Sequence, residues 1–72
     1  MQQSQQTSVS NTYYNLVSVL YHALESAQTA ATYVRDAQQS GDQQLAQFFQ
    51  SVQQTANQQA QQAQQLLARS SR

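Results

Sequence analysis

The chain of 72 residues contains no cysteine, proline, tryptophan or lysine, and it has a single glycine. Without cysteine it can form neither a disulfide nor a thiolate metal site. Without proline, nothing in the sequence breaks a helix except the segment around Gly41. Charge is equally scarce, since three acidic and three basic side chains leave a formal net charge of zero. The six charged residues are Glu25, Arg35, Asp36, Asp42, Arg69 and Arg72.

These shortages exclude several classes of function. The three arginines are too few and too scattered to bind nucleic acid by counterion release. There is no basic face for an anionic membrane surface, and no apolar run approaches the roughly 20 residues of a membrane span. The first residues also lack the basic and apolar regions of a signal peptide. We therefore expect a soluble, cytoplasmic protein with no nucleic-acid, membrane or small-molecule partner.

Glutamine takes the place of the missing charge, with 19 of the 72 residues. Glutamine has good helix propensity, close to that of glutamate and lysine. Its abundance is compatible with a natural low-charge protein, with an engineered, surface-neutralised scaffold, or with an association-prone Gln-rich segment. A regular apolar stripe argues against the third interpretation, because such a stripe specifies a packed helix.

Apolar residues recur at steps of three and four along two segments, which predicts an all-α antiparallel two-helix hairpin. The segment 11–69 forms it, with one helix over 12–39, a turn at 40–42 and a second helix over 42–69. Residues 1–10 are expected to be a disordered Gln/Ser-rich leader, and 70–72 a frayed tail. Ser10, Asn11 and Thr12 are candidate N-caps for the first helix. Gly41 ends the first helix. Ser40 and Gln43 have the spacing of a capping box for the second helix. Asp42 adds negative charge at the positive end of the second helix.

The apolar stripe of the first helix is broader than one partner helix can cover. A core this small usually needs further support, so we expect two hairpins to pair as a homodimeric four-helix bundle. Tyrosines on the flank, including Tyr33, suit an interface because they combine a large apolar ring with a hydroxyl group. The expected core comprises Leu16, Leu20, Leu24, Val34, Leu45, Phe49, Val52, Leu66 and Leu67. The expected interface comprises Tyr13, Tyr14, Leu16, Val17, Leu20, Tyr21 and Leu24.

Gln59 is the one polar residue inside the apolar arc of the second helix. A buried amide there requires a hydrogen-bond partner, and such a residue can fix the register or oligomeric state of a bundle. The alternative is a rim position whose amide reaches water. The sequence leaves both alternatives open.

The segment Gly41–Phe49 resembles the start of the second helix in a ferritin-like, rubrerythrin-type half-bundle. There, a Gly-x-x-x-[Ile/Leu]-Ala-x-x-Phe run follows a short turn. Small uncharacterised bacterial helical-hairpin proteins have a similar pattern. The resemblance covers about residues 13–67 and implies a helical-bundle fold. In that family, carboxylates and a Glu-x-x-His pair hold two metal ions.

The resemblance also implies that the metal site has been lost. It puts the family's Glu on Ala56, its His on Gln59 and a first-helix ligand near Ala23, and none of these is a good ligand. His22 and Glu25, with Asp36, form a weak alternative metal set. With one histidine and no phosphate-binding glycine loop, we expect no enzyme and no cofactor. The predicted function is a non-catalytic structural or protein-interaction module; the alternative is a ferritin-like metal-binding protein.

Overall fold

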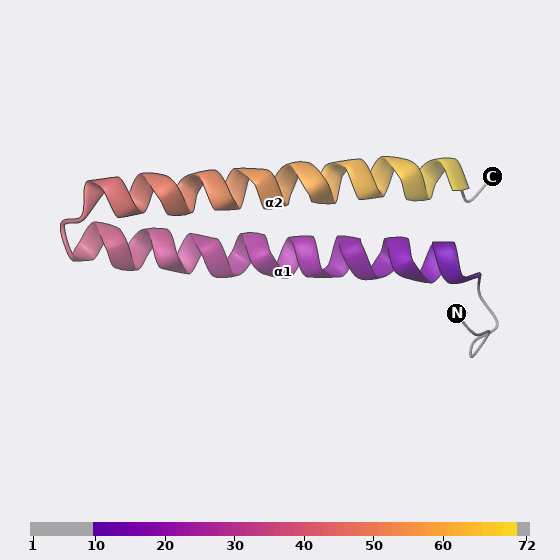
Figure 1. Cartoon of the computed structure of the whole chain (residues 1–72), viewed down its shortest axis with the longest axis horizontal. Helices are drawn as coiled ribbons and strands as arrows, with labels where there is room; N and C mark the ends of the chain where they lie inside the picture. Colours follow the sequence, from indigo (N-terminus) through magenta and orange to yellow (C-terminus); the bar gives the residue numbers. More distant parts are fainter. Residues whose placement is uncertain (1–9, 71–72) are drawn as a thin grey trace.

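The computed structural model describes residues 10–70, which form two long helices folded back on each other (Figure 1). Helix α1 spans Asn11–Gln39 and helix α2 spans Gln43–Ser70. The predicted antiparallel hairpin is confirmed. The expected disordered leader, apart from Ser10, and residues 71–72 of the expected tail lie outside the described residues. Over 10–70, neither helix has an apolar stretch long enough to cross a membrane.

Helix α1 begins at a serine cap. Ser10 is extended, with φ −67° and ψ 152°, and its hydroxyl oxygen accepts a hydrogen bond from the Tyr13 amide at 3.2 Å. The Tyr14 amide donates to the Ser10 carbonyl at 3.0 Å, which closes the first helical turn. The cap therefore satisfies one of the amide groups that a helix start leaves without an intrahelical partner.

The chain reverses direction through a Schellman motif at Gly41. Its φ of +76° lies in the left-handed region, which glycine adopts without the steric cost of a Cβ atom. The Gly41 amide donates to the Gln38 carbonyl at 3.1 Å, and the Asp42 amide donates to the Ala37 carbonyl at 3.0 Å. These two bonds satisfy carbonyls at the end of α1 and start the return of the chain.

Asp42 caps helix α2, so the predicted Ser40–Gln43 capping box is wrong. The Asp42 carboxylate accepts a hydrogen bond from the Leu45 amide at 3.0 Å. Ser40 still has helical backbone angles, and its hydroxyl donates to the Asp36 carbonyl at 2.8 Å. Because Ser40 completes the end of α1, its side chain is engaged there and does not reach the start of α2.

Replacing Gly41 by alanine should destabilise the hairpin by about 1–2 kcal/mol, the cost of placing a side chain in the left-handed region. Apart from Gly41 itself and its two neighbours in the chain, no atom lies within 4 Å of the position a Cβ would take, so the cost comes from the local backbone and not from contact with the rest of the hairpin. Thermal unfolding followed by circular dichroism measures it. Gly41→Asn is the matched control and should lose less, because asparagine tolerates this conformation. Equal melting temperatures for all three proteins would contradict the role of Gly41.

The helices pack through a seam built mainly from alanine. Over residues 10–69, the buried apolar residues are Ala23, Ala27, Ala30, Val34, Ala37, Ala46, Ala56, Ala60 and Ala63. The buried alanines, including Ala23, Ala30 and Ala37 in the contact with α2, were not among the expected core residues. The nine residues of the predicted core differ in burial. Exposed in the single chain are Leu24, Leu45 and Val52. Half-buried are Leu16, Leu20, Phe49, Leu66 and Leu67, and only Val34 is buried.

The seam follows a heptad pattern on both helices. On α1 it runs through Leu16, Leu20, Ala23, Ala27, Ala30, Val34 and Ala37; on α2 it runs through Ala46, Phe49, Gln53, Ala56, Ala60, Ala63 and Leu67. Steps of three and four keep such residues facing one partner helix along a left-handed crossing. The Tyr33–Phe49 ring contact near the turn fits a register in which Val34 is opposite Phe49 and Ala30 is opposite Gln53. The small alanine side chains fill this seam, and larger apolar residues lie at its edges.

Candidate protein-interaction surfaces

Large apolar side chains lie along both edges of the alanine seam. One group, here the turn-proximal flank, comprises Tyr33, Leu45, Phe48, Phe49 and Val52. The other, here the α1 flank, comprises Tyr13, Tyr14, Val17, Tyr21 and Leu24. Tyr33 precedes the seam residue Val34, whereas Leu24 follows the seam residue Ala23, so the two flanks lie on opposite sides of the seam. All of these side chains are exposed except Phe49, which is half-buried.

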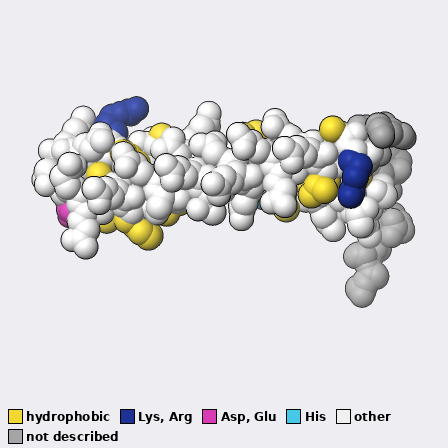
Figure 2. Space-filling view, turned by 90° about the horizontal axis from the view of Figure 1, so that it is seen from above, with side chains coloured by type: hydrophobic (Ala, Val, Ile, Leu, Met, Phe, Trp, Pro, Cys, Tyr) yellow, Lys and Arg dark blue, Asp and Glu magenta, His cyan; other side chains and the backbone are white. Residues whose placement is uncertain are grey.

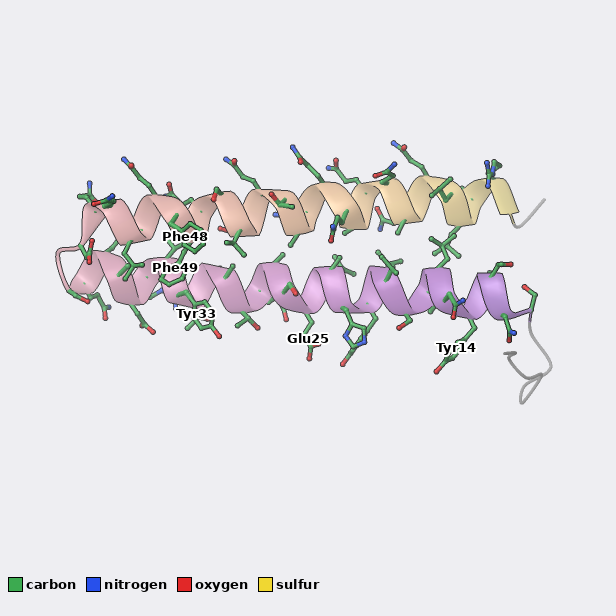
Figure 3. All side chains as sticks on the ribbon, in the orientation of Figure 1. Tyr14, Glu25, Tyr33, Phe48 and Phe49 are labelled. Carbon is green, nitrogen blue, oxygen red and sulfur yellow. The ribbon has the colours of Figure 1, made fainter. Side chains whose placement is uncertain are left out.

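Three aromatic rings form the centre of the turn-proximal flank (Figure 3). The Phe49 ring centroid lies 5.3 Å from that of Tyr33 and 5.7 Å from that of Phe48, with interplanar angles of 55° and 54°. Such tilted pairs at this spacing are favourable arrangements for aromatic side chains. Phe49 thus connects the two helices, while Phe48 remains 59% exposed and Tyr33 47% exposed. Apolar atoms project from one side of this end of the molecule in the view of Figure 2.

The surface hollows along this flank are open and shallow. One, of about 290 Å³, lies between Tyr33, Ala37, Leu45 and Phe49, with Asp36 and Ser40 at its edge. A second hollow of about 320 Å³ lies in the middle of the hairpin and is lined by Ser26, Ser51, Val52, Thr55, Ala56 and Gln59. Gln59, whose position the sequence left open, is exposed there. Because these hollows open on to solvent, they suit contact with another surface better than enclosure of a small ligand.

The predicted interface on α1 divides into two groups. Leu16 and Leu20 are half-buried and belong to the seam with α2, whereas Tyr13, Tyr14, Val17, Tyr21 and Leu24 remain exposed. The Tyr21 ring packs edge-on against His22, with centroids 5.3 Å apart and an interplanar angle of 72°. Tyr14 points away from α2 in Figure 3. The role of these residues in an interface stays a prediction.

The weak alternative metal set does not come together in the described residues. The Nδ1 atom of His22 lies 3.5 Å from Oε1 of Glu25, and the two side chains are 68% and 57% exposed. Asp36 is fourteen residues after His22, about 21 Å along the helix axis. Over residues 10–70, no three His, Cys, Asp or Glu side chains are grouped so that they could hold a metal ion. Ala23 and Ala56, which take ligand positions in the ferritin-like resemblance, are buried packing residues of the seam.

Replacing His22 by alanine should change the free energy of unfolding by less than about 0.5 kcal/mol, as expected for an exposed side chain. The contact with Glu25 is solvent-exposed and adds little. Paired thermal melts of the wild type and His22→Ala, each with and without Fe(II), measure both stability and metal binding. A melting temperature that Fe(II) raises in the wild type and leaves unchanged in the variant would instead support the metal-binding alternative.

Sequence reasoning missed two features of these surfaces. Gln53 is half-buried and occupies a seam position that the apolar pattern gives no reason to expect. Phe48 was not among the expected interface residues, although it is one of the most exposed apolar side chains. Counting heptads outward from the Gly41 turn gives both positions, because the turn determines which residues of the two helices face each other.

Comparisons with known proteins give no match. No protein-family model matches the chain, and neither the curated proteins nor the solved structures contain a significant match.

Proposed function

We propose that this chain is a non-catalytic helical interaction module that associates with a second copy of itself. The observation that carries the proposal is the distribution of apolar residues: alanine fills the seam, and most large side chains remain outside it. Tyr14, Tyr21 and Phe48 are each about 60% exposed, and Val19 is 50% exposed. An isolated hairpin of this composition leaves apolar surface of the kind that a partner buries.

The energetics are consistent with weak association. Fully burying one large apolar side chain contributes about 1.5–3 kcal/mol, so covering a half-exposed one contributes about 1 kcal/mol. Covering five such side chains on each of two copies gives on the order of 10 kcal/mol. Association itself costs roughly 4–15 kcal/mol. At the low end of that cost the net gain is about 6 kcal/mol, so the expected dimer is weak, with a dissociation constant of roughly 40 μM or higher.

The ferritin-like resemblance enters this proposal for its architecture alone. Two hairpins of this kind make a four-helix bundle, which is the assembly that the resemblance implies. Chemistry is not carried over, because buried Ala56 and exposed Gln59 offer no metal-binding carboxylate or imidazole. A low-charge surface, natural or engineered, suits such a module, because like charges that would keep copies apart are few.

Sedimentation equilibrium between micromolar and millimolar protein tests the proposal. The apparent mass should rise from 8.1 kDa toward twice that value as the concentration increases. Apolar burial drives the association, so the dimer should persist at high salt, where contacts between exposed charges are screened. A protein that stays helical and monomeric over the whole range would contradict self-association.

A further inference from the structure

Resting on the proposed self-association, we infer that the second copy binds the side of the seam that carries the turn-proximal flank and, toward the open end, Val19, and that it does so head to tail. In this arrangement the turn of each hairpin lies beside the open end of the other, and the four helices form an antiparallel bundle. The inference moves the self-association surface from the α1 flank, which the sequence favoured, to the opposite side of the seam.

The first reason is that both helices supply apolar residues on this side. Tyr33 and Val19 of α1 lie next to the seam there, and Leu45 and Val52 of α2 face the same side. On the other side α1 is apolar, but the corresponding α2 positions are exposed and polar: Gln50, Asn57 and Gln64. A hairpin packed into a four-helix bundle must bury a face to which both of its helices contribute. The turn-proximal flank meets that requirement and the α1 flank does not.

The second reason is the charge at the two ends of this side. Asp36 lines the hollow next to Tyr33, and Asp42 lines another hollow with Leu45 and Phe48. Arg69 comes three heptads after Phe48, so it lies on the same side of α2 at the far end of the hairpin. Head-to-tail association brings the acidic turn of one copy to Arg69 of the other at both ends. A head-to-head pair would instead bring together the carboxylates of Asp36 and Asp42 from both copies. The repulsion among these four like charges disfavours that orientation.

The third reason is shape. The bulky rings occupy the turn half of the flank, while the open half carries the smaller Val19 and the central hollow carries Ser26 and Thr55. Head-to-tail pairing therefore sets large side chains of one copy against the smaller side chains of the other. Both copies use the same surface, as an isologous twofold interface requires. Tyr33 and Phe48 each expose on the order of 100 Å². Together with the smaller exposed areas of Leu45, Val52 and Val19, they supply roughly half of the ~800 Å² per partner of a standard interface, and the polar residues between them would supply the rest.

Phe48→Gln tests which flank seats the second copy. Phe48 is exposed in the single hairpin, so the helix content of the dilute variant should match the wild type. Sedimentation should show the dimer dissociation constant raised by tenfold or more. Val19→Gln, on the same side of the seam near the open end, should weaken the dimer in the same direction. Tyr21→Gln is the matched control, since Tyr21 is as exposed as Phe48 but lies on the α1 flank, and its dissociation constant should stay within about threefold of the wild type.

Orientation is read from a spin label, because the chain has no cysteine of its own. A Gln43→Cys variant places the label beside the turn, at an exposed position next to the α1-flank side of the seam. In a head-to-tail dimer the two labels are separated by about the length of α2, roughly 40 Å. A separation below about 25 Å would show head-to-head pairing and overturn the orientation.

The outcomes separate this inference from the function it rests on. A wild-type chain that remains monomeric contradicts both. A dimer that Tyr21→Gln disrupts, and that Phe48→Gln and Val19→Gln leave intact, contradicts the flank assignment alone. A dimer that loses affinity in both the Phe48→Gln and the Val19→Gln variants, and whose labels lie far apart, supports the inference in full.

Discussion

Replacing Ala30 by leucine is expected to destabilise the hairpin by about 1–3 kcal/mol, the range for adding bulk to a well-packed interior. Ala30 is 1% exposed and lies at the centre of the seam. Three added carbon atoms find no space between two helices separated by alanine, so the helices must move apart or the side chain must leave its preferred rotamer. For a domain of this size, 1 kcal/mol corresponds to roughly 4–8 °C in melting temperature.

The measurement is a thermal melt at a protein concentration low enough to keep the chain monomeric. Thr32→Leu is the matched control, because Thr32 lies two residues away on the exposed face of the same helix. It adds a similar apolar side chain without entering the seam, so its melting temperature should stay close to that of the wild type. If Ala30→Leu melts at or above the wild-type temperature, the alanine seam is not the packed contact described above.

Removing the Phe49 ring should produce the second large effect. A fully buried phenylalanine costs about 3–5 kcal/mol when truncated to alanine, and Phe49 is half-buried, so about 2 kcal/mol is expected for the single hairpin. Both ring contacts, to Tyr33 and to Phe48, are lost with it. Small two-helix proteins have a low free energy of unfolding, so the Phe49→Ala variant should be largely unfolded at moderate temperature.

Phe48→Ala provides the comparison for Phe49→Ala, since the two residues are neighbours of identical chemistry and differ in burial. In dilute solution Phe48→Ala should lose less than about 1 kcal/mol, because most of its ring already contacts water. Equilibrium urea unfolding of both variants gives the two free energies directly. Equal losses would mean that the face of α2 turned toward α1 has been wrongly assigned. In concentrated protein, the loss at Phe48 should grow if this ring belongs to the dimer interface.

The elements of the fold follow from local rules, which explains why the sequence predicts them well. Gly41 is the single residue without a Cβ, and its φ of +76° is the conformation that ends α1. Ser10 was among the expected caps because a short side-chain oxygen can accept an amide hydrogen at a helix start. The cap of α2 was assigned to Ser40 by spacing alone. Asp42 takes that role because the Schellman turn retains Ser40 in the last turn of α1.

The faces of the helices were harder to predict. The wheel of α1 is apolar over a wide arc, and hydrophobicity alone favours its leucines and valines as the inner face. The structure places Ala23, Ala27 and Ala30 there, and Leu24 is left exposed. Closely packed helices favour small side chains between them, and sequence periodicity does not report the distance between helices. For the same reason Gln53, not Gln59, proved to be the amide in the seam.

By itself, the sequence determined the two helices, their antiparallel return at Gly41 and the lack of any cysteine-based or strongly basic site. These properties depend on backbone preference and composition, which each residue carries locally. The tertiary structure decided which apolar residues pair within one chain and which remain outside it, because that choice depends on how near the two helix axes lie. From it came the turn-proximal flank, where Tyr33 of α1 meets Phe49 of α2 across 5.3 Å. Residues sixteen positions apart form one surface there, which no pattern along a single helix reveals.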